Sequence, residues 1–249
     1  MTDAFRACAL IPTFDNPRTV TGTVEAVHAH LADILLIDDG SGAEGRAACE
    51  QLAARGLVQL HRRPTNGGKG TAVRDGFELA QQLGYTHAFQ IDGDGQHDVA
   101  CIPAFLDAAR QQPGALVLGY PVYDETAPRG RVIGRRITDF WVALELAGRP
   151  RIRDAMIGFR IYPLHASRSV RSAGERMDFD IEIVVLLARH GTPVVNLPVG
   201  VRYLSSQAGG VSHFRPLWDN LSFCRLHARL CIVGVFGWAG RLLGIGSKP

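Results

Sequence analysis

The chain has 249 residues, of which 46% are hydrophobic and 20% are charged. This is enough apolar material for a sizeable core, and it excludes a disordered, collagenous or coiled-coil chain. The 27 Lys and Arg residues against 24 Asp and Glu residues leave a net charge of only +3, which disfavours nucleic acid as a partner.

The cysteines and the N-terminus indicate a compartment. The chain has 5 cysteines at wide spacings and no C-x-x-C pair, which disfavours a disulfide framework or a zinc knuckle and favours a reducing environment. Residues 1–6 contain a carboxylate and no apolar run, so we expect no signal peptide. No run of about 20 apolar residues is present, so we expect no transmembrane helix. The sequence predicts a cytoplasmic protein.

In the first half of the chain, short apolar runs alternate with segments of helical periodicity. The expected strands span residues 7–11, 34–37, 57–60, 88–91 and 115–118. The expected helices span residues 19–31, 43–55, 70–83 and 102–110. Short, wholly apolar strands joined by helices form a mostly parallel sheet that helices cover on both faces. In such a sheet the ligand site lies beyond the carboxyl ends of the strands.

The second half of the chain is less regular. We expect helices over 129–146, 180–190 and 216–246, and strands over 159–162 and 194–201, the last broken at Pro198. No repeat or linker is found, so we expect one domain over 1–213 and a C-terminal helical segment over 214–249. An apolar stretch in this segment, 230–240, has arginines and tryptophans nearby, as in helices that lie on anionic membranes. A core-packing or dimerising helix is the alternative.

Paired acids follow two of the expected strands. Asp38 and Asp39 follow the second strand, and Asp92 and Asp94 follow the fourth. Carboxylates this close repel each other without a counter-charge, which Mg²⁺ or Mn²⁺ supplies through oxygen ligands and shared substrate phosphates. Turn and helix-cap chemistry is the alternative, above all for the first pair. The second pair therefore predicts a divalent metal site.

A glycine-rich segment, Asn-Gly-Gly-Lys-Gly-Thr at 66–71, precedes an expected helix. It is not a Walker A loop, because Arg63 stands where that motif has glycine and Gly70 stands where it has Ser or Thr. No G-x-G-x-x-G follows the first strand, which disfavours a dinucleotide-binding fold. A plain helix-entry turn is one interpretation. The other is a turn whose amides and Lys69 border a nucleotide site.

Four segments in order carry a family resemblance: IPTFDN, IDDGS, NGGKGTA and DGDGQH, at 11–16, 37–41, 66–72 and 92–97. Together they resemble the signature of glycosyltransferase family 2, in its branch of polyprenyl- and dolichyl-phosphate mannosyl- and glucosyltransferases. Residues 154–160 resemble the D-x-x-x-G-F-R/K segment of that branch, and residues 176–182 resemble its R-x-x-F-D-x-E segment. The resemblance covers residues 5 to 215.

The resemblance implies the GT-A fold of nucleotide-diphospho-sugar transferases: an α/β fold with a mostly parallel central sheet, helices on both faces and, here, a C-terminal amphipathic or apolar helix. It implies inverting transfer from a UDP- or GDP-sugar with Mg²⁺ or Mn²⁺. The metal ligands of the DXD motif and its surroundings fall on Asp92, Asp94 and Gln96. The donor-binding residues fall on Pro12, Phe14, Asn16, Ile37, Asp39, Lys69, Asp92, Gly93, Asp94, Arg202 and His213.

Two of these positions depart from the family pattern. Phe14 stands where tyrosine is usual, so ring stacking on the base is retained and one polar contact is lost. His213 stands where lysine is usual, so its contact with the diphosphate depends on its protonation.

The resemblance also implies a lipid-linked acceptor, and we expect a polyprenyl phosphate. In-line displacement of a nucleoside diphosphate needs neutralisation of the leaving group, a role for metal-bound Asp94 and for Arg202. A hydroxyl acceptor also needs a general base, for which Asp180 is the first candidate. A phosphate acceptor needs none, and an arginine cluster that is otherwise a solvated basic face can hold it. The cluster consists of Arg129, Arg131, Arg135 and Arg136.

Two alternatives stay open, and a third is disfavoured. One is a glycosyltransferase that uses Asp180 as a base toward a hydroxyl of another lipid, a glycan or a small molecule. Another is a catalytically silent subunit that binds nucleotide sugars. A nucleotidyltransferase of the same fold is disfavoured, because no glycine-rich loop follows the first strand. The sequence predicts peripheral attachment to the cytoplasmic face of a membrane, and it leaves base, sugar and oligomeric state open.

Overall fold

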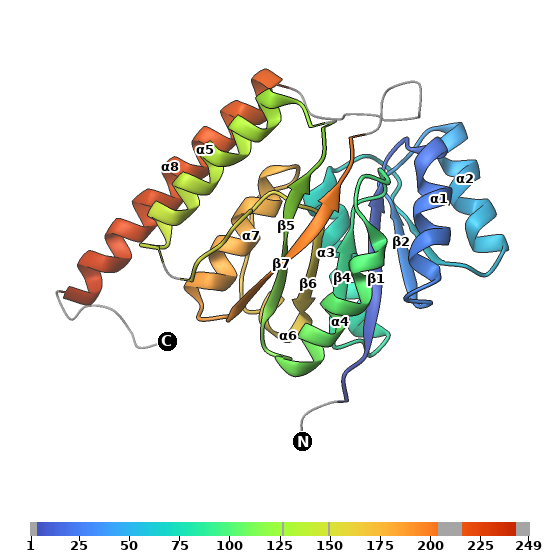
Figure 1. Cartoon of the computed structure of the whole chain (residues 1–249), viewed down its shortest axis with the longest axis horizontal. Coiled ribbons are helices and arrows are strands. Elements are labelled where there is room, and N and C mark those ends of the chain that lie inside the picture. Colours follow the sequence, from blue (N-terminus) through green and yellow to red (C-terminus); the bar gives the residue numbers. More distant parts are fainter. Residues whose placement is uncertain (1–3, 126, 149, 204–215, 243–249) are drawn as a thin grey trace.

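The computed structural model describes residues 4–125, 127–148, 150–203 and 216–242 (Figure 1). A 7-stranded sheet lies at its centre, in the order β3-β2-β1-β4-β6-β5-β7. The strands are β1 (Ala7–Thr13), β2 (Ile34–Asp38), β3 (Gln59–Arg62), β4 (His87–Ile91), β5 (Leu116–Tyr123), β6 (Phe159–Pro163) and β7 (Val194–Val201). Strand β6 runs antiparallel to both of its neighbours, and the other pairs are parallel. The mostly parallel sheet predicted from the sequence is therefore confirmed.

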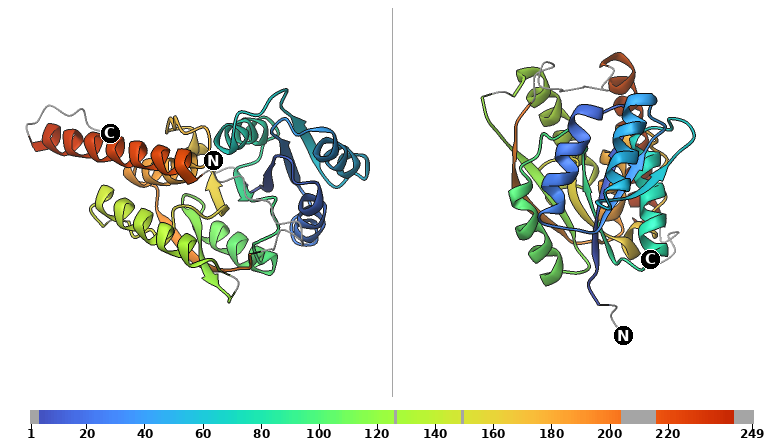
Figure 2. Two further views of the ribbon diagram at one scale, coloured as in Figure 1. Left: turned by 90° about the horizontal axis from the view of Figure 1, so that it is seen from above. Right: turned by 90° about the vertical axis from the view of Figure 1, so that its right-hand side faces the viewer.

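Helices cover both faces of this sheet, and Figure 2 shows the layers from two further directions. The helices are α1 (Pro17–His28), α2 (Ala43–Ala54), α3 (Lys69–Gln82), α4 (Ile102–Gln111), α5 (Arg129–Glu145), α6 (Leu164–Ser167), α7 (Asp178–Arg189) and α8 (Pro216–Leu242), with a short 3₁₀ turn, η1 (Val99–Cys101), before α4. Alternate residues of β1 point to opposite faces. Ala9 and Ile11 pack with α1, α2 and α4, whereas Cys8 and Leu10 pack with α3, α6 and α7.

The parallel part of the sheet positions the functional loops. Strands β2 and β4 are buried at every position, which matches their uninterrupted apolar sequences. Because β1, β2 and β4 run in the same direction, their carboxyl ends lie at one edge of the sheet. The segments that follow them carry Phe14, Asp39 and Asp92, which are thereby gathered at that edge.

Two strands differ from the sequence prediction. Strand β7 continues through Pro198, where we expected a break, because β7 lies at the edge of the sheet and pairs only with β5. A proline without an N–H is tolerated on an edge strand. Strand β3 lies at Gln59–Arg62 and not at 57–60, since its register pairs Gln59 with Leu35 of β2. The apolar residues Leu57 and Val58 pack against the core from just before the strand.

The last described helix, α8, lies beside α5 and α7. The three helices share an apolar cluster that includes Val142 of α5, Val185 of α7 and Leu226 of α8. Polar contacts add to it: Arg189 donates to the carbonyl oxygens of Glu145 and Leu230, at 3.1 and 2.8 Å. The predicted boundary at residue 213 lies outside the described residues. Within those residues, no helix is long and apolar enough to cross a bilayer.

Candidate active site

A cavity of about 1330 Å³ opens at the carboxyl edge of the sheet and extends between α5 and α8. Its sheet end is polar and includes Asp39, Lys69, Asp92 and Asp94. Of the other predicted donor-binding and metal residues, five also line it: Pro12, Phe14, Asn16, Gly93 and Gln96. The strand ends have therefore brought together segments that are far apart in the sequence, as the parallel sheet requires.

The two adjacent aspartates after β2 have different surroundings. Asp38 is buried and away from the cavity, where it accepts from the Ser41 amide at 2.9 Å and pairs with Arg62 at 2.6 Å. Its surroundings fit the alternative of turn chemistry. Asp39 lines the cavity, and its carboxylate accepts from the amides of Gly67 and Gly68 at 2.9 and 2.7 Å.

The glycine-rich segment is therefore shaped around Asp39. The amides of Gly67 and Gly68, which we expected to border a nucleotide, face this carboxylate. Gly68 has a φ of +92°, and a Cβ there would lie 2.5 Å from the carbonyl oxygen of Glu175. Arg63 pairs with Asp39 and, at 2.7 Å, with Asp75. The loop thus fixes one carboxylate at the cavity wall by hydrogen bonds and by charge.

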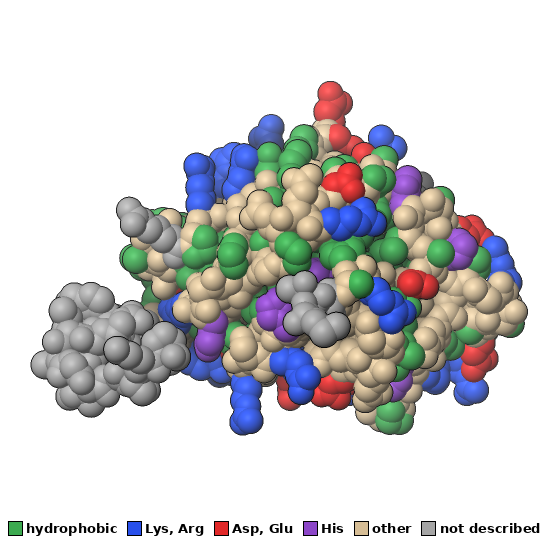
Figure 3. All heavy atoms as spheres, turned by 90° about the horizontal axis from the view of Figure 1, so that it is seen from below, with side chains coloured by type: hydrophobic (Ala, Val, Ile, Leu, Met, Phe, Trp, Pro, Cys, Tyr) green, Lys and Arg blue, Asp and Glu red, His purple; other side chains and the backbone are tan. Residues whose placement is uncertain are grey.

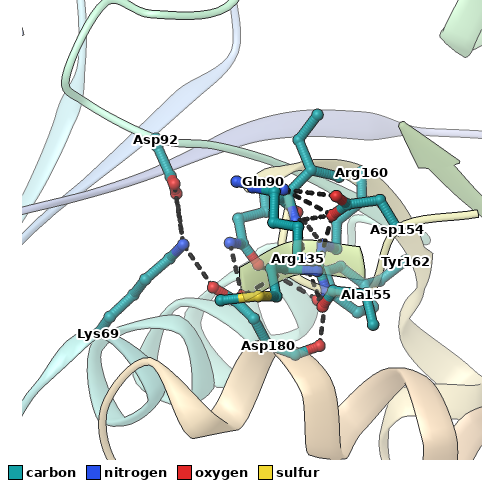
Figure 4. A network of polar contacts seen from close by, with 11 residues as sticks. Lys69, Gln90, Asp92, Arg135, Asp154, Ala155, Arg160, Tyr162 and Asp180 are labelled. Carbon is teal, nitrogen blue, oxygen red and sulfur yellow. Dashed lines mark hydrogen bonds and ion pairs between the residues drawn. The ribbon is translucent and has the colours of Figure 1, made fainter. Parts of the chain in front are cut away.

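A largely buried ammonium links two of the predicted site carboxylates, as Figure 4 shows. The Nζ atom of Lys69 lies 2.6 Å from Asp180 Oδ2 and 2.8 Å from Asp92 Oδ1. Burial alone would lower the pKa of Lys69, but the charges of Asp180 and Asp92 raise it above its ordinary value. Burial likewise acts to raise the pKa of Asp92, and the Lys69 charge keeps it below its usual range. Lys69 and Asp92 are therefore both charged at neutral pH.

Asp94 has different electrostatic surroundings. Burial, and after it the nearby charge of Asp92, raises the pKa of Asp94 above its ordinary value. Its Oδ1 accepts from the Gln96 amide at 3.1 Å. A half-buried carboxylate with a raised pKa is short of positive charge, which a divalent cation can supply.

The residues present fit a hard divalent cation. Asp92, Asp94 and Gln96 offer oxygen atoms at the cavity wall, the ligand type that Mg²⁺ and Mn²⁺ prefer. Within the described part of the chain, no group of three or more His, Cys, Asp and Glu side chains is arranged to hold a metal. A cation held by Asp92, Asp94 and Gln96 would take its remaining ligands from a substrate diphosphate and water, as is usual for Mg²⁺.

Two arginines of the predicted acceptor cluster lie on the same cavity. One Nη atom of Arg135 lies 2.7 Å from both carboxylate oxygens of Asp154, and Arg131 lies over the ring of Tyr203, 5.1 Å from its centroid. Both arginines line the cavity. Asp154 is itself fixed, because its Oδ1 accepts from two backbone amides just before β6. Arg129 and Arg136 are exposed and do not line the cavity.

Three further predicted site residues do not line the cavity. Ile37 is in the core below the sheet edge. Arg202 has a side chain that is 78% exposed and lies 3.4 Å from Asp124, away from the cavity lining. The Asp180 side chain is 3% exposed and does not line the cavity. His213 falls outside the described residues.

The far part of the cavity was not predicted from the sequence. Helices α5 and α8 form its walls with mainly apolar side chains, among them Ile137, Trp141, Phe223 and Ile232. His227 also lines it, with Nδ1 held by Glu145 at 2.7 Å. The sequence does carry a signal for this apolar wall: Ile133, Ile137 and Trp141 are spaced four residues apart, and such residues share one helix face.

Known proteins resemble this chain in sequence and in fold. The sequence model of glycosyl transferase family 2 matches residues 8–181. The undecaprenyl-phosphate mannosyltransferase of Micrococcus luteus is 26% identical over 208 residues, covering 78% of this chain and 82% of that protein. The polyprenol monophosphomannose synthase of Mycolicibacterium smegmatis is 25% identical over 211 residues, covering 78% of this chain and 76% of that protein.

Solved structures resemble the whole fold. The crystal structure of glucosyl-3-phosphoglycerate synthase from Mycobacterium tuberculosis with Mn²⁺, UDP and phosphoglyceric acid superposes with a TM-score of 0.69. It is 14% identical, and the match covers 93% of this chain and 78% of that one. The predicted family resemblance and the predicted GT-A fold are both confirmed.

We expect Asp94→Asn to separate activity from stability. The raised pKa of Asp94 means that its ionised form costs stability, and this cost appears as the pH rises through the folded-state pKa. Without metal, the variant should therefore melt at the wild-type temperature or slightly above it at neutral pH, and any gain should vanish in acid. With metal, turnover should fall about 10²–10³-fold, because the leaving diphosphate is less well neutralised.

Melting curves across pH and sugar-transfer assays across Mn²⁺ concentrations check both parts. A variant that melts normally and keeps nearly full activity at saturating Mn²⁺ would show that Asp94 belongs only to a turn.

Proposed function

Because this chain belongs to glycosyl transferase family 2, we propose that it is a metal-dependent, inverting glycosyltransferase with a polyprenyl phosphate as its acceptor. The donor would be a UDP- or GDP-sugar. One observation carries the proposal: the same cavity holds the carboxylates at the sheet edge, the two arginines of α5 and an apolar extension between α5 and α8. These parts correspond to a nucleotide diphosphate with its metal, an acceptor phosphate and a hydrocarbon chain.

On the donor side, Phe14 and Pro12 offer apolar surface to the base, with Asn16 and Asp39 beside them on the cavity wall. Asp39 is pre-organised by two amides and Arg63, so it loses little freedom when a nucleoside binds. The cation that Asp92, Asp94 and Gln96 would hold supplies Lewis-acid neutralisation of the leaving diphosphate. The synthase from Mycobacterium tuberculosis, which was crystallised with Mn²⁺ and UDP, supports this assignment.

On the acceptor side, the charges favour a phosphate over a hydroxyl. Arg131 and Arg135 lie on the cavity wall, and guanidinium groups bind phosphate through paired hydrogen bonds. The carboxylates among the described lining residues are Asp39, Asp92 and Asp94. Asp39 accepts from two amides, Asp92 pairs with Lys69, and Asp94 accepts from an amide at the proposed metal position. A phosphate is already ionised and needs no base. The two bacterial relatives, named for undecaprenyl phosphate and polyprenol monophosphomannose, support the same choice.

The outer surface of α5 supports a membrane as the place of reaction. Five large apolar side chains on it are 39–65% exposed, and we call them the α5 stripe: Ile133, Ile137, Phe140, Trp141 and Leu144. Arg136 of α5 and Arg225 of α8 are exposed. Figure 3 shows Lys and Arg side chains at the end of the molecule where these two helices lie. The acids of α5 are inward: Asp139 is half-buried and the Glu145 side chain is buried.

Apolar groups among cations fit a bilayer with anionic lipid. Ile133, Ile137 and Trp141 belong both to the stripe and to the cavity lining. A lipid acceptor would therefore have a continuous apolar path from the bilayer into the cavity.

The nucleotide is tested by thermal-shift measurements with UDP, GDP and dTDP, each with and without Mn²⁺. We expect at least one to raise the melting temperature in a Mn²⁺-dependent way, because a ligand that binds only the folded state stabilises it by mass action. If no nucleotide shifts the transition with or without metal, the glycosyltransferase proposal fails.

The acceptor is tested with a polyprenyl phosphate and the matching polyprenol, which differ only in the phosphate. We expect transfer to the phosphate alone. We expect Arg131→Gln to raise the KM for the phosphate acceptor about tenfold or more, since a charge-assisted hydrogen bond contributes roughly 1.5–3 kcal/mol. Hydrolysis of the donor sugar should change little in this variant. Transfer to the polyprenol at a similar rate would instead support a base-assisted mechanism.

Membrane attachment is tested by flotation with vesicles that contain phosphatidylglycerol. The double variant Phe140→Asp/Leu144→Asp places two charges on the α5 stripe at positions outside the cavity lining. We expect about tenfold less floated protein and unchanged transfer to a short, water-soluble prenyl phosphate. Val122→Asp, at an exposed apolar residue off the stripe, is the matched control and should float normally. Equal flotation of both variants would exclude the stripe as the membrane contact.

A further inference from the structure

We propose that Asp180 serves the reaction as a positioning residue: it holds Lys69 as an internal counter-cation of Asp92, so that Asp92 stays available to the metal. This inference deepens the proposed function and rests on it. It assigns Asp180 a different role from the general base that its place in the sequence suggested.

The position of Asp180 argues against a direct part in proton transfer. Its side chain is 3% exposed and does not line the cavity. Both carboxylate oxygens are already used, since Oδ2 accepts from Lys69 at 2.6 Å and Oδ1 accepts from Gln90 Nε2 at 3.1 Å. A general base must come within hydrogen-bond reach of the acceptor hydroxyl. The Lys69 ammonium lies between Asp180 and Asp92 (Figure 4), and of these three residues Lys69 and Asp92 line the cavity.

A chain of buried hydrogen bonds fixes Asp180 from behind. Arg160 and Tyr162 on β6 are both fully buried, and Arg160 Nη1 donates to the Tyr162 hydroxyl at 3.3 Å. The Tyr162 hydroxyl donates to Gln90 Oε1 at 3.2 Å. Because a carboxamide has one oxygen and one NH₂, this contact turns the NH₂ of Gln90 toward Asp180. The Arg160 guanidinium also lies 3.8 Å from Asp180 Oδ1.

Asp92 is fixed from the opposite side. Its amide donates to the carbonyl oxygen of Gly158 at 2.9 Å. A Cβ on Gly158 would lie 2.1 Å from the Asp92 carboxylate, so only glycine leaves room for that side chain. The carboxylate is thus confined between Gly158 and the ammonium of Lys69.

The electrostatic consequence follows from the charges. The single positive charge of Lys69 is shared between the two carboxylates, so it neutralises Asp92 only in part. The remaining negative charge of Asp92 can attract a cation. If Asp180 loses its charge, Lys69 pairs with Asp92 alone and competes with a divalent cation for that carboxylate. Metal affinity should then fall, although Asp180 does not touch the metal. If Asp180 were the base, the rate would fall at every metal concentration.

The experiment compares direct Mn²⁺ binding with turnover. Isothermal titration with Mn²⁺ alone needs neither donor nor acceptor, so it reads the site without the reaction. We expect Asp180→Asn to raise the Kd for Mn²⁺ about tenfold, as is typical when a partner behind a metal ligand is removed. At saturating Mn²⁺, the kcat for sugar transfer should return to within about threefold of wild type.

A second variant keeps the inference testable if Asp180→Asn does not fold. Tyr162→Phe removes only the hydroxyl that orients Gln90, and we expect it to raise the Kd in the same direction by a smaller factor. Asp107→Asn is the matched control: it neutralises an exposed carboxylate that pairs with Arg110 on α4, and it should leave both readings unchanged.

Two results would overturn the inference. One is an unchanged Kd for Mn²⁺ in Asp180→Asn and Tyr162→Phe. The other is a kcat of Asp180→Asn that stays about 100-fold low at saturating Mn²⁺ with a normal Kd, which would identify Asp180 as the base. These differ from failure of the proposed function, which would appear in the wild-type protein as no binding of Mn²⁺ or of any nucleotide.

Discussion

The parallel sheet brings several carboxylates to one edge, and their mutual repulsion is the constraint on which the site depends. Each is neutralised differently. Asp39 has two amides and Arg63, while Asp92 and Asp180 share the buried Lys69. Asp94 is the one whose pKa is raised by burial and by a neighbouring charge. Negative charge is therefore concentrated where a metal and a diphosphate would meet. If Asp92 and Asp94 hold a metal as proposed, the lysine of the glycine-rich segment belongs to that site as much as the acids do.

Much of the fold follows from sequence patterns because burial on both faces of a parallel sheet demands uninterrupted apolar strands. Strands β2 and β4 obey this rule and were located to within one residue. Strand β3 was displaced because it lies at an edge and is only partly buried, so the apolar pair before it gave the stronger signal. The expected break at Pro198 was wrong for a related reason. A proline rule that holds inside a sheet does not hold at its edge, and edge position is a property of topology.

The loops and strand ends that form the site could be predicted from the sequence. Which side chains pair with one another there could not. Arg63 shows the limit: in the sequence it counts only against a Walker A loop, whereas in the fold it pairs with Asp39. The amides of Gly67 and Gly68 were expected to face a ligand, and they face that same carboxylate. Their hydrogen bonds join segments nearly thirty residues apart, so no local pattern reveals them. The motif that contains Asp180 likewise identifies the residue, but it does not show that the carboxylate pairs with Lys69.

Helix α5 lines both the polar and the apolar part of the cavity. Its cavity-facing side begins with Arg131 and Arg135 and becomes apolar by Trp141. From Arg131 to Trp141 the helix advances about 15 Å, at about 1.5 Å per residue. A phosphate held at the arginines would therefore place the first prenyl units of its chain beside Ile137 and Trp141. Since α8 closes the other side through an apolar cluster shared with α5 and α7, acceptor binding and the packing of the C-terminal helix depend on the same surfaces. Changes in that packing should thus affect binding of the proposed acceptor before binding of the proposed donor, whose candidate residues follow β1, β2 and β4.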